Sequence, residues 1–578
     1  MPFLRRALPG FVCGLPCGIL LAGAFGNVSL GLAVGAVLGT AYALALPRPI
    51  GGEGAAADRA MTAAAFGLPI WGSLNVILLP LLAGQMPQWT AEGMRALFPA
   101  LVGWLLFGFA VGLLTTGAVR LAERLFGVTP AAPEPGAPEV KARVVILGGG
   151  FAGVTTAMNL EKEFRHDPSV AFTLVSETNA LLFTPMLAEV AASSLEPTHI
   201  STPLRSSLHR TRVVRAQVSG IDLEERCVKL PDREETLPYD HLVLALGAVS
   251  SLPPGDGIAE HALEFKTLAD AMRIRNHVID AFDRADAEAD VERRRALLTF
   301  VVAGGGFSGA ELVGALNDFA RGMLADYPVL SVDDLRIILV HSRERILPEL
   351  SASLADYALE RMRARGVTFE LNARVSAARP GVVVLRRKEP EKTDATKKPL
   401  PLELEIPTET LVWTAGAAPS PLLKELAVER DKRGAVLVEN TLAVRGHSGL
   451  WALGDCAIVP DAKTGKPCPP TAQFAIREAR TLARNVRASI NGETLKPFHF
   501  DSLGTLCVVG HQTACAEIKG YKFSGFFAWF LWRSLYLGKL PGLERKVRVL
   551  GDWTIELFFP RDIVQTIDFG PTREKSQP

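Results

Sequence analysis

A glycine-rich stretch from Val144 to Gly153, VVILGGGFAG, constrains the fold of this chain most strongly. Four apolar residues typical of a strand run into the pattern Gly148-x-Gly150-x-x-Gly153, and a helical pattern follows. Gly148 permits a tight turn, Gly150 lets the backbone approach a pyrophosphate, and Gly153 lets the helix pack closely on the strand. The helix N-terminus then faces the phosphates. The pattern therefore predicts a parallel α/β domain that binds a dinucleotide.

The same pattern recurs further along the chain as TFVVAGGGFSG, from Thr299 to Gly309. A strand, the glycines of Gly304-x-Gly306-x-x-Gly309 and a helix again stand in this order. Two such domains predict two dinucleotides, and the simplest interpretation is a flavin that a nicotinamide nucleotide reduces. The alternative is a pair of glycine-rich turns without ligands, which the strand–turn–helix context disfavours.

Apolar runs dominate the chain before its proline-rich spacer. Residues 7–47 carry no Asp, Glu, Lys, Arg or His, and as one helix they would extend about 60 Å, roughly twice the hydrocarbon thickness of a bilayer. We therefore expect two passes there, with a turn near Gly26. A cleaved signal peptide is disfavoured because later apolar runs follow. We expect four transmembrane spans, at residues 8–26, 28–46, 61–84 and 97–119.

Arginines that flank these spans predict the orientation. All but Arg95 fall on one side, namely Arg5, Arg6, Arg48, Arg59, Arg120 and Arg124. By the positive-inside tendency, the N-terminus and everything after the last span lie on the cytoplasmic side of the cell (inner) membrane. The spans contain no ionisable residue, so the module is expected to anchor the protein and not to pump ions. Glycines permit close helix contact, within the module or between copies, at Gly14, Gly18, Gly31, Gly35 and Gly39.

Composition excludes several classes of protein. The net charge of +1 and the absence of basic runs give no sign of nucleic-acid binding. The seven cysteines have no CxxC motif and no paired zinc spacing, which favours a reducing compartment and predicts neither a disulfide framework nor a metal site. Four prolines in residues 129–140 predict an extended spacer. The mixed-charge run Arg386 to Lys398 predicts a solvated hairpin or loop.

Polar residues end the second strand of each predicted nucleotide domain. The strand AFTLVSE ends at Glu177, where an acid accepts from a ribose hydroxyl. An ordinary exposed glutamate, with Ser176 in the ribose position, is the alternative. The strand from Arg336 ends at His341, where an NADH-selective site usually has an acid. His341 and Arg343 either face a 2′-phosphate or are solvated, so the choice between NADH and NADPH stays open.

Several stretches resemble the type II NADH:quinone oxidoreductases, the single-subunit alternative NADH dehydrogenases. They are Leu182–Arg205, Tyr239–Gly247, Glu264–Arg275, Leu411–Gly416, Leu450–Ala457, Pro469–Ala479 and Ser502–Ile563. The resemblance covers about Lys141 to Val564 and leaves out the N-terminal spans. It implies an α/β fold with two Rossmann-like domains related to glutathione reductase. It also implies that NADH or NADPH reduces FAD, which reduces a membrane quinone without proton pumping.

The resemblance further implies individual site residues. Glu311 matches an acid near the nicotinamide, and Asp455 matches the acid at the ribityl and phosphate part of the flavin. Gln473 matches a glutamine associated with quinone binding, with helix capping or surface polarity as the alternative. The other expected cofactor contacts are Gly148, Gly150, Phe151, Ala152, Gly153, Glu177, Gly247, Gly304, Gly306, Gly309, His341, Gly416 and Ala472.

An aromatic stretch from Phe526 to Tyr536 predicts a helix too short to span a bilayer. The basic residues after it include Lys539, Arg545 and Lys546. This composition suits a helix that lies in the membrane interface. The alternative is a helix buried in the core or in a homodimer interface.

The expected domains are a transmembrane anchor (1–128), a linker (129–140), a split FAD domain (141–259 and 433–489), an NAD(P)H domain (260–432) and a membrane-association module (490–578). A sulfide:quinone oxidoreductase would need two redox cysteines near the flavin, and none occurs between Cys227 and Cys456 or in the helix after Gly153. A membrane-tethered NAD(P)H-binding flavoprotein with a sensing role is the other alternative. The expected partners are a membrane quinone and the lipid bilayer.

Overall fold

The computed structural model describes residues 2–45, 60–61, 63–64, 66–67, 70–86, 91–126, 140–231, 236–253, 256–388 and 402–565. The chain forms two compact units. The first, here the helical unit, comprises Met1–Gly136 and Leu540–Gly551. The second, here the α/β unit, comprises Ala137–Lys539 and Asp552–Pro578. The predicted spacer lies outside the described residues except for Val140.

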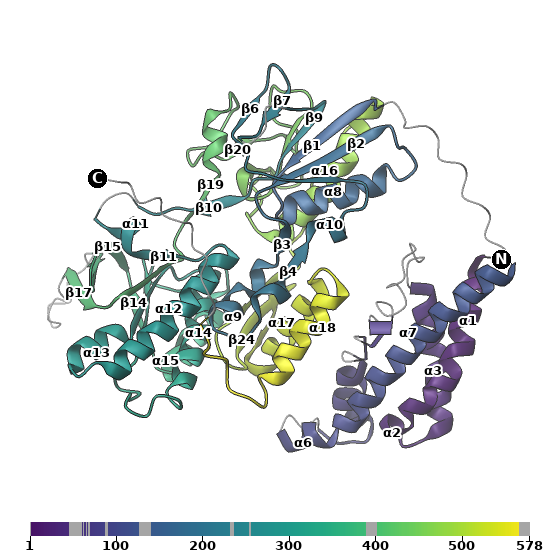
Figure 1. Cartoon of the computed structure of the whole chain (residues 1–578), viewed down its shortest axis with the longest axis horizontal. Helices are drawn as coiled ribbons and strands as arrows, with labels where there is room; N and C mark the ends of the chain where they lie inside the picture. The colour runs from purple at the N-terminus through teal and green to yellow at the C-terminus, as the bar shows by residue number, and fades with distance from the viewer. Residues whose placement is uncertain are drawn as a thin grey trace. The chain divides into compact units, whose positions relative to one another are not determined.

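Close glycine contacts join the first helices of the helical unit. The first apolar run consists of α1 (Pro2–Cys17), η1 (Gly18–Leu21) and α2 (Ala22–Phe25), and the chain then turns at Gly26, whose φ is 63°, into α3 (Val28–Ala45). A Cβ atom on Gly31 would lie 2.6 Å from the carbonyl oxygen of Gly18. A Cβ on Gly14 would overlap the backbone of Gly35. The predicted glycine contact therefore forms within this unit, between α1 and α3 (Figure 1).

The buried side-chain amide of Asn75 links three helical segments of the helical unit by hydrogen bonds. The elements that follow α3 include the π-helical turn η2 (Gly72–Leu78), α5 (Leu79–Leu82), α6 (Ala91–Ala96) and α7 (Phe98–Phe126). Asn75 of η2 donates to the carbonyl of Ala24 at 2.8 Å and accepts from the indole of Trp104 at 2.8 Å. Both hydrogen-bonding ends of the amide are thus satisfied, as burial requires.

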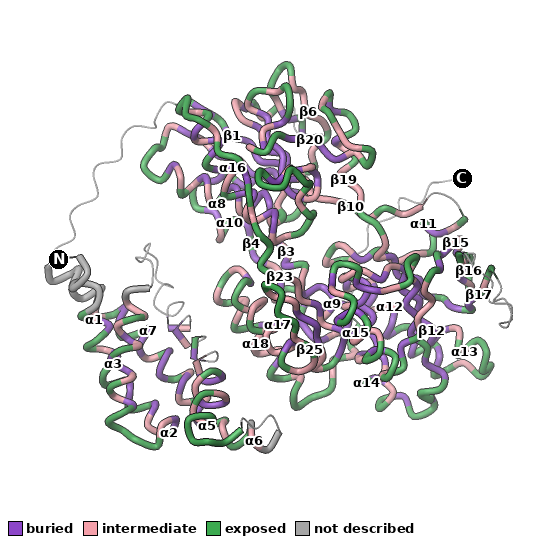
Figure 2. The backbone as a smooth tube through the Cα atoms, turned by 180° about the vertical axis from the view of Figure 1, so that it is seen from behind, coloured by how far each residue is buried: buried purple, intermediate pink, exposed green. Residues whose placement is uncertain are grey.

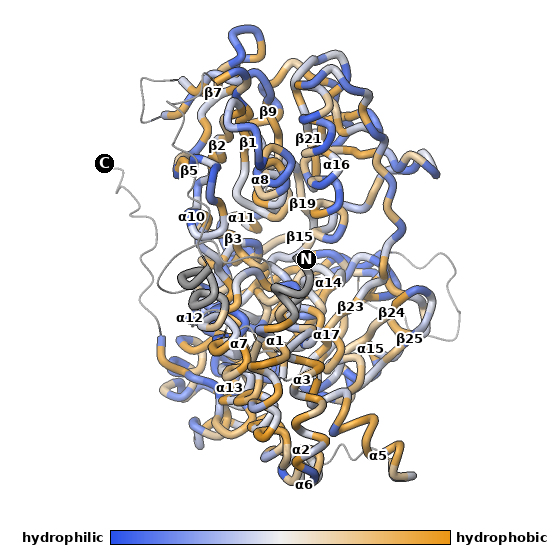
Figure 3. The backbone as a smooth tube through the Cα atoms, turned by 90° about the vertical axis from the view of Figure 1, so that its right-hand side faces the viewer, coloured by the Kyte–Doolittle hydropathy of each residue, from blue (hydrophilic) through white to orange (hydrophobic). Residues whose placement is uncertain are grey.

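The predicted set of four transmembrane spans is not confirmed, because only two helices of the described residues have the length and composition of a span. Leu8–Phe25 and Phe98–Ala118 are long and apolar enough to cross a membrane. Val28–Ala43 and Gly72–Leu82 are apolar but shorter. Part of the predicted third span lies outside the described residues, and the π-helical turn η2 occupies another part of it. Figure 3 shows hydrophobic residues along most of α3 and α5. The side chains of the arginines that predicted the orientation lie outside the described residues, except for Arg95.

A parallel five-stranded sheet forms the first half of the α/β unit. Its order is β21-β9-β1-β2-β5, with β1 (Ala142–Leu147), β2 (Val170–Ser176), β5 (Arg212–Arg215), β9 (His241–Leu244) and β21 (Leu450–Ala452). The first fingerprint leads from β1 into α8 (Phe151–Glu163), which packs against α16 (Ala472–Asn491). The apolar residues of β1 belong to a large cluster of buried apolar residues, and Figure 2 shows how buried residues are distributed along the backbone. The predicted strand, turn and helix are confirmed.

A second parallel sheet repeats this arrangement. Its order is β11-β18-β12-β13-β14, with β11 (Ala262–Glu264), β12 (Thr299–Ala303), β13 (Arg336–His341), β14 (Val367–Leu371) and β18 (Thr410–Trp413). Its helices are α12 (Leu268–Ala287), α13 (Val291–Leu297), α14 (Phe307–Met323) and α15 (Ala352–Ala364). The antiparallel pair β10 (Ala248–Ser250) and β19 (Ala417–Pro419) lies where the chain leaves and re-enters the first half (Figure 1). The α/β dinucleotide-binding fold class is therefore confirmed.

The C-terminal module is a three-stranded antiparallel sheet with a helix. It comprises β23 (Gly504–Val508), β24 (Ala514–Ile518), β25 (Tyr521–Ser524) and α17 (Gly525–Lys539). The next helix along the chain is α18 (Leu543–Ile555), most of which belongs to the helical unit. Helix α17 packs on β24 and buries Trp532, while Phe527 is exposed. Its 15 residues are fewer than a bilayer crossing needs, as predicted.

Short elements complete the α/β unit. The pair β16 (Val382–Arg387) and β17 (Glu403–Pro407) is antiparallel. The mixed-charge run begins within β16 at Arg386, and its part from residue 389 on lies outside the described residues. The others are β3 (Ala180–Leu182), α9 (Leu187–Ala191), β4 (Ser201–Pro203), α10 (Leu204–Ser207), β6 (Gly220–Asp222), β7 (Cys227–Lys229), β8 (Leu237–Pro238), α11 (Ile258–His261), β15 (Ala373–Arg379), β20 (Val436–Leu437) and β22 (Ala457–Ile458), with the 3₁₀ turns η3 (Thr184–Met186), η4 (Pro197–Ile200), η5 (Pro421–Glu425) and η6 (Gly454–Cys456).

The glycine contact in the helical unit makes a prediction about stability. Gly14→Val should force α1 and α3 apart and lower the free energy of unfolding by about 1–3 kcal/mol, because the backbones leave no room for a side chain. Gly23→Val is the matched control, since a Cβ there has no neighbour within 4 Å. Circular dichroism of the full chain on heating in detergent measures the difference. Equal loss of stability in both variants would contradict the contact.

Candidate active site

The first fingerprint forms a cradle of backbone beside the N-terminus of α8. Gly148 has φ 115°, and a Cβ there would overlap the carbonyl of Ala245. A Cβ on Gly153 would overlap the carbonyl of Gly148. In contrast, no atom lies within 4 Å of where a Cβ of Gly150 would stand. Two of the glycines are therefore needed by the protein itself, and the third faces open space.

The second fingerprint has the same division of roles. Gly304 has φ 121°, and a Cβ on Gly309 would overlap the Gly304 carbonyl. A Cβ on Gly306 would meet only Glu349, whose Oε1 lies 3.7 Å from that point. Glu349 is an acid beside the fingerprint that the sequence did not predict, because it lies far beyond the strand end where such an acid is expected.

The helices that follow the fingerprints begin without a side-chain cap. Neither Gly150 at α8 nor Gly306 at α14 caps the first N–H groups, and Thr471 at α16 does not cap them either. Elsewhere the chain does cap helices, since Thr267 accepts from Asp270 at α12 and Asp290 caps α13. Uncapped first-turn N–H groups beside open space can bind an anion such as a pyrophosphate.

Asp455 lies in the turn η6 directly after β21, as the resemblance implies. It is half-buried, and burial raises its pKa, opposed by the charge of Lys266. Glu478 of α16 holds this turn by accepting from the N–H of Gly454 at 2.8 Å. Burial raises the pKa of Glu478 to about 7. Sequence reasoning missed Glu478, because nothing in its neighbourhood along the chain signals the contact.

Several other predicted flavin contacts lie around the first cradle. Glu177 is exposed directly after β2, while Ser176 is buried. Phe151 begins α8, and its ring lies 5.7 Å from that of Phe183. Ala152 is buried in the first turn of that helix. The structure therefore leaves Glu177 accessible to a ligand.

Gly247 and Gly416 stand just before the paired strands β10 and β19. Their φ values are 63° and 84°, so both turns require the left-handed conformation that glycine adopts readily. These two predicted contacts thus lie at the two passages of the chain between the parallel sheets.

Glu311 and Gln473 contact opposite ends of the same strand, β23. The backbone N–H of Val508 donates to Glu311 at 3.4 Å, and burial raises the pKa of this carboxyl to about 8. At the other end, the amide of Gln473 donates to the Ser502 hydroxyl at 3.2 Å and accepts from the N–H of Leu503 at 3.2 Å. Ala472 precedes Gln473 as the first residue of α16. Both candidate catalytic residues therefore meet the C-terminal module.

His341 turns its ring toward the second fingerprint. Its Nδ1 accepts from the N–H of Gly305 at 3.1 Å. Burial, followed by the charge of Arg343, lowers the pKa of His341, so the ring is neutral at pH 7. The proton then stands on Nε2, which is buried without a hydrogen-bond partner among the described residues. A neutral imidazole beside the glycine turn has no charge that would attract a 2′-phosphate.

All seven cysteines are free thiols in the structure. Cys507 and Cys515 face each other across β23 and β24. Burial raises the pKa of both, that of Cys515 to about 12. Because the thiolate is the reactive form, these thiols are poor nucleophiles at neutral pH.

Two family models match the α/β unit. The one described as pyridine nucleotide-disulphide oxidoreductase matches residues 142–479, and the one described as NDH2 C-terminal domain matches residues 502–562. The type II NADH:quinone oxidoreductase NdhA of Mycobacterium tuberculosis is 32% identical over 443 residues, which cover 74% of this chain and 90% of the relative. The demethylphylloquinone reductase NdbB of a Synechocystis strain is 30% identical over 436 residues, which cover 72% and 98%.

Solved structures show the same fold. NDH2 from Plasmodium falciparum in complex with NADH has a TM-score of 0.65 at 18% identity, covering 73% of this chain and all of the other. The sulfide:quinone oxidoreductase of Aquifex aeolicus has a TM-score of 0.55 at 16% identity, covering 72% and 95%.

The glycine geometry predicts different outcomes within one fingerprint. Gly150→Val should leave the protein folded but without bound flavin, because its side chain would occupy only the open space in the cradle. Gly153→Val should lower the free energy of unfolding even without cofactor, because its side chain would overlap backbone. Flavin absorbance and thermal unfolding of both purified variants check this. A Gly150→Val protein that retains its flavin would contradict the position assigned to the pyrophosphate.

Proposed function

The chain belongs to the type II NADH:quinone oxidoreductases, and we propose from this premise that it transfers two electrons from NADH through FAD to a membrane quinone. The observation that carries the proposal is the repeated strand–glycine turn–helix arrangement, each time with an uncapped helix beside open space. A C-terminal module of the NDH2 type follows both repeats. Transfer without proton pumping accords with apolar spans that contain no ionisable residue.

The first cradle fits FAD. When bound, FAD takes up a hydride from NADH and passes electrons singly or in pairs to a quinone. The N–H groups at Phe151 and Ala152 would hold the pyrophosphate next to Gly150. Glu177, exposed after β2, would accept from the ribose, and Asp455 would accept from the ribityl chain. Ala472 and Gln473 would present the uncapped start of α16 to the ring system.

The second cradle fits NADH. Gly304 and Gly309 shape the turn, and Gly306 leaves room for the pyrophosphate. The neutral His341, whose Nδ1 accepts from the Gly305 N–H, would hold the glycine turn beside the ribose. Arg343, two residues after His341 in the chain, would accommodate a 2′-phosphate. We therefore propose that the enzyme prefers NADH and still accepts NADPH.

A sulfide:quinone oxidoreductase needs a reactive pair of cysteines. The cross-strand pair Cys507 and Cys515 is present in the C-terminal module, but the raised pKa values keep both thiols protonated. Direct electron transfer to quinone is therefore favoured. A sensing protein with little turnover would not need Glu311 and Gln473 at the two ends of β23.

The helical unit is proposed to anchor the enzyme by four passes. Two helices of sufficient length and two shorter apolar helices support this arrangement. Helix α17, with Phe527 exposed and Lys539 at its end, is proposed to lie in the membrane interface. The α/β unit then faces the cytoplasm, and the exposed part of α17 offers a surface for lipid or for a second copy of the chain.

The four-pass arrangement predicts the topology of the loop after α5. Reporter fusions placed between Gln85 and Ala91 should be external, while fusions at the N-terminus and after Val140 should be cytoplasmic. The reason is the excess of arginine on the other side of the spans. A cytoplasmic signal from the Gln85 fusion would rule out four passes.

The role of Gln473 makes a prediction about the two half-reactions. Gln473→Ala should leave flavin reduction by NADH nearly unchanged. It should slow reoxidation by quinone roughly two- to tenfold, because one hydrogen bond to a neutral carbonyl contributes about 0.5–1.5 kcal/mol. Stopped-flow absorbance at the flavin band resolves both steps. Asn491→Ala, an exposed amide at the far end of the same helix, is the control. Equal slowing of both steps would instead assign Gln473 a structural role against Ser502 and Leu503.

A further inference from the structure

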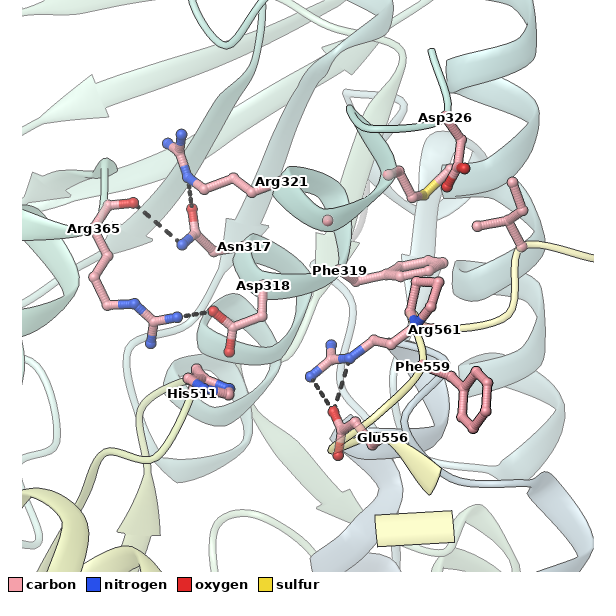
Figure 4. A pocket seen from close by; sticks show the side chains of 14 residues that line it. Asn317, Asp318, Phe319, Arg321, Asp326, Arg365, His511, Glu556, Phe559 and Arg561 are labelled. Carbon is pink, nitrogen blue, oxygen red and sulfur yellow. Dashed lines mark hydrogen bonds and ion pairs between the residues drawn. The ribbon is translucent and has the colours of Figure 1, made fainter. Parts of the chain in front are cut away.

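Two neighbouring cavities lie between α14 and residues 556–563, here the C-terminal segment of the α/β unit. The larger has a volume of about 570 Å³ and exposed residues at its rim, among them Asp326 and Phe559 (Figure 4). The smaller has a volume of about 50 Å³, enough for at least one water molecule. The two share part of their lining, namely Asp318, His511, Glu556 and Arg561.

The shared lining consists of ion pairs and a histidine. Arg561 pairs with Glu556 at 2.8 Å, and Arg365 pairs with Asp318. Figure 4 shows both pairs, with His511 next to Asp318. Burial raises the pKa of Asp318. Two carboxyl groups, an imidazole and a guanidinium thus line both the larger cavity, here the outer cavity, and the smaller one, here the inner cavity.

Glu189 of α9 lines the inner cavity. Its Oε1 lies 3.6 Å from Arg533, which also contacts Glu556 at 3.1 Å. Its Oε2 is buried without a hydrogen-bond partner among the described residues, and so are the Ser194 hydroxyl and Nε of Arg533. All three atoms belong to residues that line this cavity. Buried polar atoms without partners are the usual sites of internal water.

The inner cavity also reaches the neighbourhood of Glu311. Val508 lines it, and the N–H of Val508 is the donor to Glu311. The charge of Glu189 contributes to the raised pKa of Glu311, so the two carboxyls interact. Burial raises the pKa of Glu189 to about 7, opposed by Arg533 and Arg561 and reinforced by Glu556. A group whose pKa lies near the working pH both accepts and donates protons readily.

The proposed function requires a proton from solvent, and the inference rests on that function. NADH delivers two electrons and one proton as a hydride, whereas a quinone takes up two electrons and two protons to become a quinol. One proton in each turnover must therefore enter from water.

We propose that Glu189 relays this proton, through water in the inner cavity, from the outer cavity to Glu311. In this role Glu189 is a positioning residue that acts through Glu311. The charged groups that face it are Arg533 from α17, Glu556 and Arg561 from the C-terminal segment, and Glu311 from α14.

The test compares Glu189→Gln with Glu196→Gln, an exposed carboxyl next to the same segment. The full chain in lipid is used, with NADH and a soluble quinone. Flavin reduction by NADH should be unchanged in both variants. Flavin reoxidation by quinone at pH 7 should fall on the order of a hundredfold in Glu189→Gln only, since general acid–base groups contribute this much. Glu189→Asp should recover part of the rate.

The pH dependence and an infrared measurement distinguish a relay from a structural role. In the wild type, reoxidation should slow as the pH rises through the pKa of Glu189, because the donor loses its proton, and Glu189→Gln should lose this dependence. The infrared band of protonated carboxyl groups should titrate near pH 7 in the wild type and lack that component in Glu189→Gln. Equal reoxidation rates in wild type and Glu189→Gln would overturn the relay alone. A wild type that oxidises NADH but reduces no quinone would overturn the proposed function and the relay together.

Discussion

The tight turn that joins each central strand to its helix is the constraint on which the α/β unit depends. In both turns the first and last glycines touch backbone, so only glycine permits the strand and helix to approach so closely. The middle glycine, Gly150 or Gly306, does not touch backbone in this way, and it provides no side-chain cap for the first N–H groups of the helix. The N-termini of α8 and α14 therefore both have first-turn N–H groups without a side-chain cap, which is the arrangement that suits an anion such as a pyrophosphate.

Three buried carboxyl groups of the α/β unit lie in surroundings that favour their neutral form. Burial raises the pKa of Glu311 to about 8 and those of Glu189 and Glu478 to about 7. Glu478 supports the turn that carries Asp455, and the other two lie beside the C-terminal module. An enzyme that takes up protons while it transfers electrons needs such groups near neutrality. We therefore propose that the C-terminal module serves the chemistry as well as the attachment to the membrane.

Local patterns could be predicted from the sequence, because their cause lies within a few residues. The glycine turns, the strands before them, the helices after them and the short α17 all follow this rule. Glu189, Glu349 and Glu478 could not be predicted, because their environments arise from elements distant in the chain. The orientation of His341 depends likewise on an N–H in another turn. In the helical unit, composition predicted apolar runs, but hydropathy alone did not predict the π-helical turn of residues 72–78.

The central claim is that one flavin connects NADH with quinone in this chain. Purified full-length protein, freed of oxygen, should show a flavin spectrum that one equivalent of NADH bleaches and one equivalent of quinone restores. This titration tests both cradles and the C-terminal module at once. A protein without flavin, or a reduced flavin that quinone cannot reoxidise, would contradict the account.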